Sequence, residues 1–128
     1  MSDLDQIRRT IAEHPQTLDD GDVDRYVSLF VDEARLTAGT TEYVGTNAIR
    51  GFIKGYFDGQ GPSRQTRHLF GNSVIDFDGQ QAKSISDVMV FARDNDEAWA
   101  LTNLTRHHDT LVRSGDRWLF AAKEIRRR

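Results

Sequence analysis

Histidine is the residue type in this sequence best suited to proton transfer, and the chain has four: His14, His68, His107 and His108. A neutral imidazole can take a proton from an acidified carbon because its ordinary pKa is about 6.5. A carboxylate bound to the other ring nitrogen would fix the tautomer and stabilise the imidazolium that forms. A histidine on a strand is nevertheless more often a structural residue than a base, so the residue types alone leave both roles open.

Metal binding and covalent catalysis find less support in the residue types. The chain contains no cysteine, which excludes disulfides, thiolate metal ligands and a cysteine nucleophile. His107 and His108 are adjacent, and neighbouring residues of a strand point to opposite faces, so the two cannot bind one ion. Histidines from separate elements could still gather around zinc, but we expect no metal and no cofactor. Ser84 and Ser86 lack the elbow motif that exposes a serine nucleophile.

The composition favours one globular domain that binds neither nucleic acid nor a membrane. A length of 128 residues fits a single domain over residues 1–128. The net charge of −3 and the pI of about 5.8 do not indicate the clustered positive surface that nucleic acids require. No apolar stretch approaches the ~18 residues that span a bilayer, and the first twenty residues are charged, unlike a signal peptide. We therefore expect a cytoplasmic protein.

The first twenty residues predict an amphipathic helix. Ser2 or Asp3 can cap its start, and Gly21 can end it. Pro15 lacks a backbone donor, so we expect it to interrupt the helix and to kink the chain around residues 12–14. The apolar positions that fall near a 3.6-residue period are Leu4, Ile7, Ile11 and Leu18.

Two more helices and two short strands follow in the pattern. Asp22 can cap a second helix over residues 23–30, and Thr46 can cap a third that stops at residues 59–62. Between these helices, residues 34–38 and 41–44 predict two short strands joined through Gly39. The apolar residues on one face of the third helix are Ile49, Phe52, Ile53 and Tyr56.

The character of the sequence changes after residue 65, where β-branched and aromatic residues become frequent. Four long strands are predicted, separated by turns rich in Asp, Asn and Gly: residues 66–77, 81–93, 99–113 and 117–126. Helices followed by an antiparallel meander indicate the α+β class. We expect a cone-shaped barrel in which three N-terminal helices pack on a strongly curved, mainly antiparallel sheet. Its concave side would hold a small-molecule pocket.

Alternation along the strands groups the polar residues that can share this pocket. His68, Phe70 and Asn72 lie on one side of their strand, provided that no bulge shifts the register. A later strand places another set on one side: Asn103, Thr105, His107 and Asp109. Asn103 and Asp109 suit either a pocket wall or contacts with a second subunit. The residues expected to line the pocket are Tyr26, Phe52, Asn72, Asn103, His107 and Asp109.

Three segments together carry a resemblance to a known family. They are LDDGDVDRYVSLFVDEARL from residue 18, TRHLFGNSVIDFDGQQA from residue 66, and HHDTLVRSGDRWLF from residue 107. In their order and spacing they resemble the SnoaL-like branch of the nuclear-transport-factor-two-like superfamily. The match runs from about Leu4 to Ile125. It implies the same cone-shaped α+β fold that the periodicity predicts.

The resemblance also implies a set of site residues. Scytalone dehydratase, bile-acid dehydratases and hexachlorocyclohexane dehydrochlorinase of this branch use a His–Asp pair for elimination. By resemblance the aspartate falls on Asp19 and the histidine on His68, while a polar helix residue falls on His14 and a late-strand arginine on Lys123. His14 would protonate or polarise a leaving group, and Lys123 would stabilise an oxyanion or a departing anion. The combination of a helix histidine with a late lysine departs from these relatives.

The function expected from these observations is that of a cofactor-independent lyase or isomerase. It would abstract a proton, as dehydratases do, from a small and largely apolar molecule through the His–Asp pair. The alternative is a non-catalytic domain of the same fold that binds a small ligand or a partner. Both sides of the strand at residues 81–93 carry apolar residues, Val88 and Val90 against Ile85 and Met89. We therefore also expect a homodimer formed through the sheet.

Overall fold

The computed structural model describes residues 1–127, and the first element, helix α1, spans Asp3–Asp20. The side-chain oxygen of Ser2 accepts a hydrogen bond from the backbone N–H of Asp5 at 3.1 Å, which caps its start. Gly21 ends it in the left-handed conformation with φ of 66°. The helix continues through Pro15, so the predicted interruption is wrong. Pro15 lies on the buried face, where packing against the sheet side holds the helix despite one missing donor.

A short helix leads directly into the sheet. Helix α2 spans Val23–Ser28, and the Asp22 carboxylate caps it by accepting from the N–H of Arg25 at 3.1 Å. Strand β1 spans Phe30–Ala38, so it starts earlier than the residue pattern predicted. Phe30 belongs to this strand rather than to the preceding helix because it pairs in parallel with Phe120. This long-range pairing is invisible to the local helical period.

A hairpin and the third helix complete the N-terminal part. Strand β2 spans Thr41–Val44 and pairs antiparallel with β1 through a turn at Gly39, whose φ is 63°. Helix α3 spans Thr46–Asp58 and ends at Gly59. Gly45, not Thr46, occupies the cap position, and no side chain bonds the first amides. The sequence therefore placed the helix correctly but its cap one residue late.

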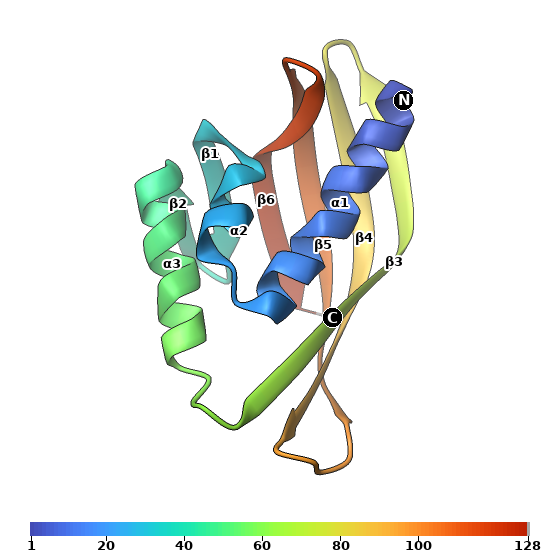
Figure 1. Cartoon of the computed structure of the whole chain (residues 1–128). Helices are drawn as coiled ribbons and strands as arrows, with labels where there is room; N and C mark the ends of the chain where they lie inside the picture. The colour runs from blue at the N-terminus through green and yellow to red at the C-terminus, as the bar shows by residue number, and fades with distance from the viewer. Residues whose placement is uncertain (128) are drawn as a thin grey trace.

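The meander forms the rest of the sheet. Its strands are β3 (Arg64–Asp78), β4 (Gln81–Asp94), β5 (Ala100–Ser114) and β6 (Arg117–Arg127). The order across the sheet is β2-β1-β6-β5-β4-β3, with every neighbouring pair antiparallel except β1 and β6. The three helices lie across one face of this twisted sheet, α1 running diagonally over it (Figure 1). The prediction of an α+β fold with a curved, mainly antiparallel sheet is confirmed.

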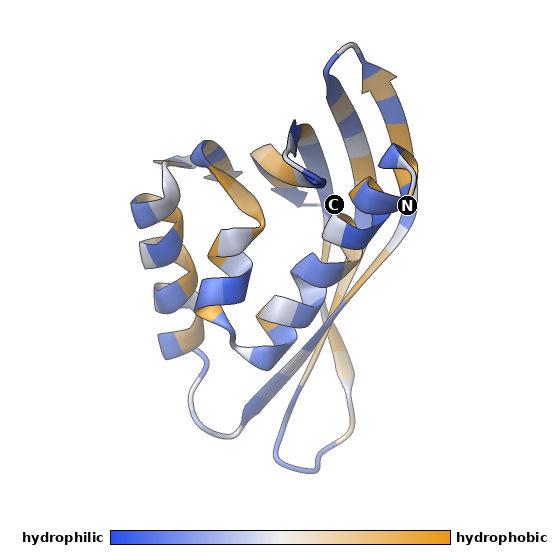
Figure 2. Cartoon of the chain, turned by 45° about the horizontal axis from the view of Figure 1, so that its top comes forward, coloured by the Kyte–Doolittle hydropathy of each residue, from blue (hydrophilic) through white to orange (hydrophobic). Residues whose placement is uncertain are grey.

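The core lies between the helices and the inner face of the sheet. Ile49 and Ile53, one turn apart on α3, are almost completely buried, as such spacing on an amphipathic helix predicts. Figure 2 shows hydrophobic residues on the side of α3 that faces the rest of the domain, with hydrophilic residues opposite. The rings of Tyr26, Phe30 and Phe120 follow one another in a row, tilted to each other, with neighbouring centroids 5.3 Å apart. This aromatic row joins α2, β1 and β6.

The outer face of the sheet carries apolar side chains that no described residue covers. Leu69, Met89 and Leu104 are direct cross-strand neighbours on β3, β4 and β5, with exposed fractions of 51%, 41% and 44%. Val74 and Ile85 form a second exposed pair on the same face. The predicted apolar character of both sides of β4 is therefore present, with Val88 buried inside.

Candidate functional site

The last turn of α1 places Asp19 against His68 on β3. Asp19 Oδ1 lies 2.8 Å from His68 Nδ1, and both carboxylate oxygens lie 3.1 Å from the backbone nitrogen of His68. The two side chains are only 13% and 9% exposed. Because a carboxylate can only accept at this contact, Nδ1 carries the hydrogen and Nε2 keeps its lone pair in the neutral ring. The backbone N–H of His68 holds the Asp19 carboxylate in place, and the carboxylate in turn orients the His68 ring.

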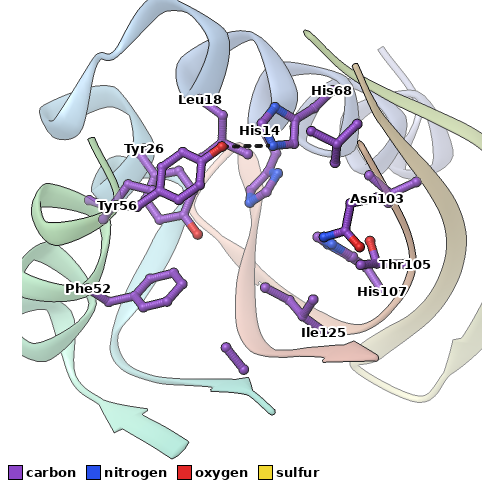
Figure 3. A pocket seen from close by; sticks show the side chains of 14 residues that line it. His14, Leu18, Tyr26, Phe52, Tyr56, His68, Asn103, Thr105, His107 and Ile125 are labelled. Atoms are coloured by element: carbon purple, nitrogen blue, oxygen red, sulfur yellow. Dashed lines mark hydrogen bonds between the residues drawn. The ribbon is translucent and has the colours of Figure 1, made fainter. Parts of the chain in front are cut away.

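His68 Nε2 faces a cavity between the helices and the sheet. The Tyr56 hydroxyl lies 3.5 Å from this nitrogen, and Figure 3 shows the two side chains directed toward each other. Burial raises the pKa of Tyr56, so its hydroxyl stays protonated at neutral pH. The phenol can therefore donate toward a base or toward a bound molecule beside it.

The cavity has a volume of about 220 Å³. An engineered cavity of ~150 Å³ holds benzene, so this one admits a molecule somewhat larger than a single ring. Its apolar lining comes from both layers: Leu18, Ala38, Phe52, Ile53, Val88, Val90 and Ile125. The lining residues that carry polar atoms are His14, Tyr26, Tyr56, His68, Asn103, Thr105 and His107. No acidic or cationic side chain lines it among the described residues, which suits a neutral and largely apolar ligand.

His14 lies on the buried face of α1 at the cavity wall. It is 1% exposed, and neither ring nitrogen has a hydrogen-bond partner within residues 1–127. The rings of Tyr26, Phe70 and Phe120 surround it, with centroids 5.0, 5.4 and 5.6 Å away. Burial, aided by the charge of Lys123, holds the pKa of His14 well below its ordinary value. The imidazole is therefore neutral at pH 7, with two unused nitrogens.

Lys123 forms a buried polar cluster with two residues of β5. Its ammonium nitrogen lies 2.8 Å from Asp109 Oδ1 and 3.3 Å from His107 Nδ1, and the lysine and aspartate side chains are fully buried. The Phe120 ring lies beneath the ammonium, with its centroid 4.2 Å away. Burial lowers the pKa of Lys123 and raises the pKa of Asp109, while the attraction between the two opposes both shifts.

The structure gathers most of the sequence-predicted residues around one cavity. Tyr26, Phe52, Asn103 and His107 line it together with His14 and His68. Asp109 does not line this cavity, because its carboxylate is directed to Lys123. This correction follows from the cross-strand register, which makes the two residues direct partners on β5 and β6.

Asn72 is the second residue that differs from the expected placement. The pairing of β3 with β4 shifts between Gly71 and Val74, and Asn72 adopts a positive φ of 52°. Its exposed side chain is directed to Asp87, away from the cavity residues around His68. A bulge thus breaks the alternation that grouped Asn72 with His68.

Tyr56 is the functional candidate that sequence reasoning did not single out. Its signal was its place on the apolar face of α3, one turn after Phe52. A tyrosine at such a position is interpreted as a core residue unless the partner of its hydroxyl is known.

His108 lies on the outer side of β5, opposite His107, as adjacent strand residues must. Within residues 1–127, no three His, Cys, Asp or Glu side chains are grouped to hold a metal ion.

Comparison with known proteins identifies the family. The model of the SnoaL-like domain matches residues 1–124, and the chain belongs to this family. None of the curated proteins compared with the chain by sequence matches it. No helix in the described part of the chain is long and apolar enough to cross a membrane.

Several solved structures share the fold of this chain. ActVI-ORFA from Streptomyces coelicolor superposes with a TM-score of 0.87 at 18% identity, covering 97% of this chain and 96% of that protein. A candidate scytalone dehydratase from Novosphingobium aromaticivorans gives 0.83 at 23% identity, with coverages of 98% and 83%. A protein from Catenulispora acidiphila, solved in complex with S-DNPA, gives 0.83 at 21% identity, with coverages of 95% and 90%. At these identities the structures establish the fold alone.

Proposed function

We propose that this SnoaL-like chain is a cofactor-independent lyase or isomerase that removes a proton from a small, largely apolar molecule. The observation that carries the proposal is the 2.8 Å contact between Asp19 and His68 Nδ1, which leaves the lone pair of Nε2 on the cavity side, beside the Tyr56 hydroxyl. An imidazole held in this way has the tautomer, the orientation and the stabilising charge that a general base needs.

The proposed reaction starts with a carbon acid bound beside His68. The C–H proton moves to Nε2, and the electron pair left on carbon forms a double bond as a leaving group departs or as an adjacent carbonyl becomes an enolate. The Asp19 carboxylate stabilises the imidazolium, because its oxygen accepts from Nδ1–H. The Tyr56 hydroxyl next to Nε2 can donate to the reacting molecule. General-base catalysis of this kind contributes about a hundred- to ten-thousand-fold.

His14 acts in this proposal as a neutral donor at the inner wall of the cavity. Its lowered pKa excludes an imidazolium at neutral pH, so it polarises a leaving group through N–H rather than carrying a full positive charge. Its two unpartnered nitrogens support this role, since buried polar atoms normally have a partner. A bound molecule that places one polar group next to the His14 ring would supply the missing hydrogen-bond partner.

Deuterium exchange tests the proposal without the natural substrate. We would incubate 2-tetralone, a bicyclic enolisable ketone, with the protein in D2O and follow loss of its α-proton signals by NMR. The expected result is saturable acceleration in the native protein that disappears in His68→Ala. Asp20→Asn, one residue beyond Asp19 and largely exposed, is the matched control and keeps the native rate. Equal acceleration by His68→Ala would contradict the base assignment.

The alternative function is a non-catalytic ligand-binding domain. It is supported by the apolar cavity itself, which needs no chemistry to be occupied, and by the relative that was solved with S-DNPA. Under this alternative 2-tetralone binds, as a shift of cavity-residue NMR signals shows, but its protons do not exchange faster than in buffer. Binding with acceleration supports the enzyme instead.

Assembly and location complete the proposal. The exposed row of Leu69, Met89 and Leu104 supports a homodimer in which the outer faces of two sheets meet. The chain has no cysteine, so its fold does not depend on an oxidising compartment, and a cytoplasmic location is part of the proposal. We propose no nucleic acid or membrane partner.

A further inference from the structure

The contact between Lys123 and His107 fixes where the hydrogen of the second cavity histidine lies. An ammonium group donates hydrogen bonds and accepts none, so the ring nitrogen that it meets must have a free lone pair. Lys123 Nζ lies 3.3 Å from His107 Nδ1. In the neutral ring the single hydrogen is therefore on Nε2. In these tautomers Nε2 of His107 is a hydrogen-bond donor, whereas Nε2 of His68 is an acceptor.

The groups around Lys123 favour its charged form, although burial lowers the pKa of the lysine. Asp109 accepts from it at 2.8 Å, and the face of Phe120 lies 4.2 Å from the ammonium. A carboxylate and a ring face both favour the cation over the neutral amine. Burial lowers the pKa of His107, and the positive charge of Lys123 lowers it further, so His107 stays neutral. The charge therefore increases the acidity of Nε2–H without protonating Nδ1.

The ring of His107 bridges the charged cluster and the cavity. Lys123 and Asp109 do not line the cavity, whereas His107 does, beside Asn103 and Thr105. With Nδ1 held toward Lys123, the opposite edge of the ring is the part that meets a bound molecule. Figure 3 shows Asn103, Thr105 and His107 grouped on the sheet side of the cavity, with His68 on a separate strand.

We propose that His107 Nε2–H binds the carbonyl oxygen of the substrate and that Lys123 is a positioning residue that polarises it. The substrate class is then a neutral, enolisable carbonyl compound, which deepens the proposed function and rests on it. As His68 takes the proton from the carbon next to the carbonyl, the C–H electron pair forms a carbon–carbon double bond. The carbonyl π electrons move to oxygen, and the oxyanion accepts the bond from His107. A neutral imidazole can serve as such an electrophile.

The first measurement is the tautomer itself. In ¹⁵N-histidine-labelled protein at pH 7, long-range ¹H–¹⁵N spectra are expected to show His107 protonated at Nε2 and unprotonated at Nδ1. A His107 ring that carries its hydrogen on Nδ1 would overturn the proposal, because such a ring presents no donor to the cavity. The assignment uses His107→Phe, which removes the relevant signals.

The second measurement uses 4-nitrophenol, whose anion absorbs visible light and stands in for an oxyanion. The protein carries His68→Phe, so that the proposed base cannot contribute. An apolar cavity alone would suppress ionisation of the phenol, whereas a polarised donor promotes it. We expect saturable binding that lowers the apparent pKa of 4-nitrophenol. The shift becomes smaller when His107→Phe is added, because the donor held by Lys123 is lost while other lining donors, such as the Tyr56 hydroxyl and the His14 ring, remain. Adding Lys123→Met with Asp109→Leu instead should reduce the ratio of bound anion to bound phenol about tenfold or more.

His108→Phe provides the matched control, because it changes the neighbouring histidine on the opposite face of β5 and should leave the 4-nitrophenol shift unchanged. An unshifted or unbound 4-nitrophenol, or a shift that His107→Phe leaves unchanged, overturns the proposal. If the variant that combines Lys123→Met with Asp109→Leu does not fold, the NMR tautomer of His107 and the effect of His107→Phe on 4-nitrophenol still test the proposal. If the 4-nitrophenol test fails while deuterium exchange of 2-tetralone still depends on His68, the proposal for His107 is wrong and His68 remains the base. If the 4-nitrophenol shift is observed but no deuterium exchange occurs, the oxyanion site remains and the proposed reaction is wrong.

Discussion

Phe120 and Lys123 are three positions apart on β6, yet both side chains are buried on the inner face of the sheet. A regular strand would place them on opposite faces. The pairing of β5 with β6 shifts at this point: Thr110 pairs with Ala122, but Leu111 pairs with Phe120. Ala121 is the extra residue of a bulge, and it brings the ammonium of Lys123 over the Phe120 ring. The polar cluster below the cavity depends on this one residue.

The His68–Asp19 pair leads to the first prediction. Asp19→Asn keeps the shape of the side chain but removes the negative charge, so we expect α-proton exchange of 2-tetralone to slow about a hundredfold or more. The double variant with His68→Ala should be no slower than His68→Ala alone, because the carboxylate acts through the ring. NMR exchange rates measure both. Independent, multiplicative losses would show that Asp19 does not act through His68.

The buried histidines lead to a prediction about stability and pH. The pKa values of His14 and His107 are lowered in the folded chain. Below about pH 6.5, the ordinary pKa of histidine, the unfolded chain therefore binds more protons at these two residues than the folded chain does. The free energy of unfolding should therefore be level above that pH and fall on acidification, by up to about 1.4 kcal/mol per pH unit for each histidine. Urea unfolding at pH 7.5 and 5.5 measures it.

The variant His14→Phe isolates one of these contributions. Its ring fits the aromatic surroundings of His14 and cannot take up a proton. We expect the loss of stability between pH 7.5 and 5.5 to be smaller in this variant than in the native protein. An identical pH dependence in both proteins would show that His14 already binds a proton in the folded state.

The ion pair of Lys123 and Asp109 predicts an asymmetric response to mutation. Lys123→Met leaves a fully buried carboxylate without its cation, which should lower the free energy of unfolding by about 3–5 kcal/mol. Adding Asp109→Leu removes the unpaired charge, and we expect most of the loss to be recovered. Denaturant unfolding at pH 7 compares the two variants. Additive losses would indicate that the pair does not interact in the folded protein.

The outer face of the sheet predicts how the chain associates. Light scattering at micromolar concentration should give twice the 14.6 kDa of one chain. Met89→Glu places a charge in the centre of the apolar row and should shift the mass to that of a monomer. Arg8→Glu, on an exposed position of α1, is the control and should leave the dimer intact. A native protein that is already monomeric would contradict the proposed assembly.

The sequence by itself determined the elements and indicated two residues that the fold brings into contact. Its apolar periods, Gly21 and the Asp22 cap located the helices, and its turn residues separated the four long strands within one or two residues. Local physics decides these features, because caps, turns and periodicity act over a few neighbouring residues. The family pattern indicated Asp19 and His68, which the fold then brought within 2.8 Å of each other.

Tertiary structure alone decided the direction of several side chains. The bulge near Asn72 turned it out of the cavity, and the bulge at Ala121 brought Lys123 under it. Long-range pairing with Phe120 drew Phe30 into β1, and packing of the buried face kept α1 continuous through Pro15. A bulge follows from how two strands fit across a curved sheet, and one extra residue reverses every later side chain. That fit involves residues distant in the chain, so no local pattern contains it.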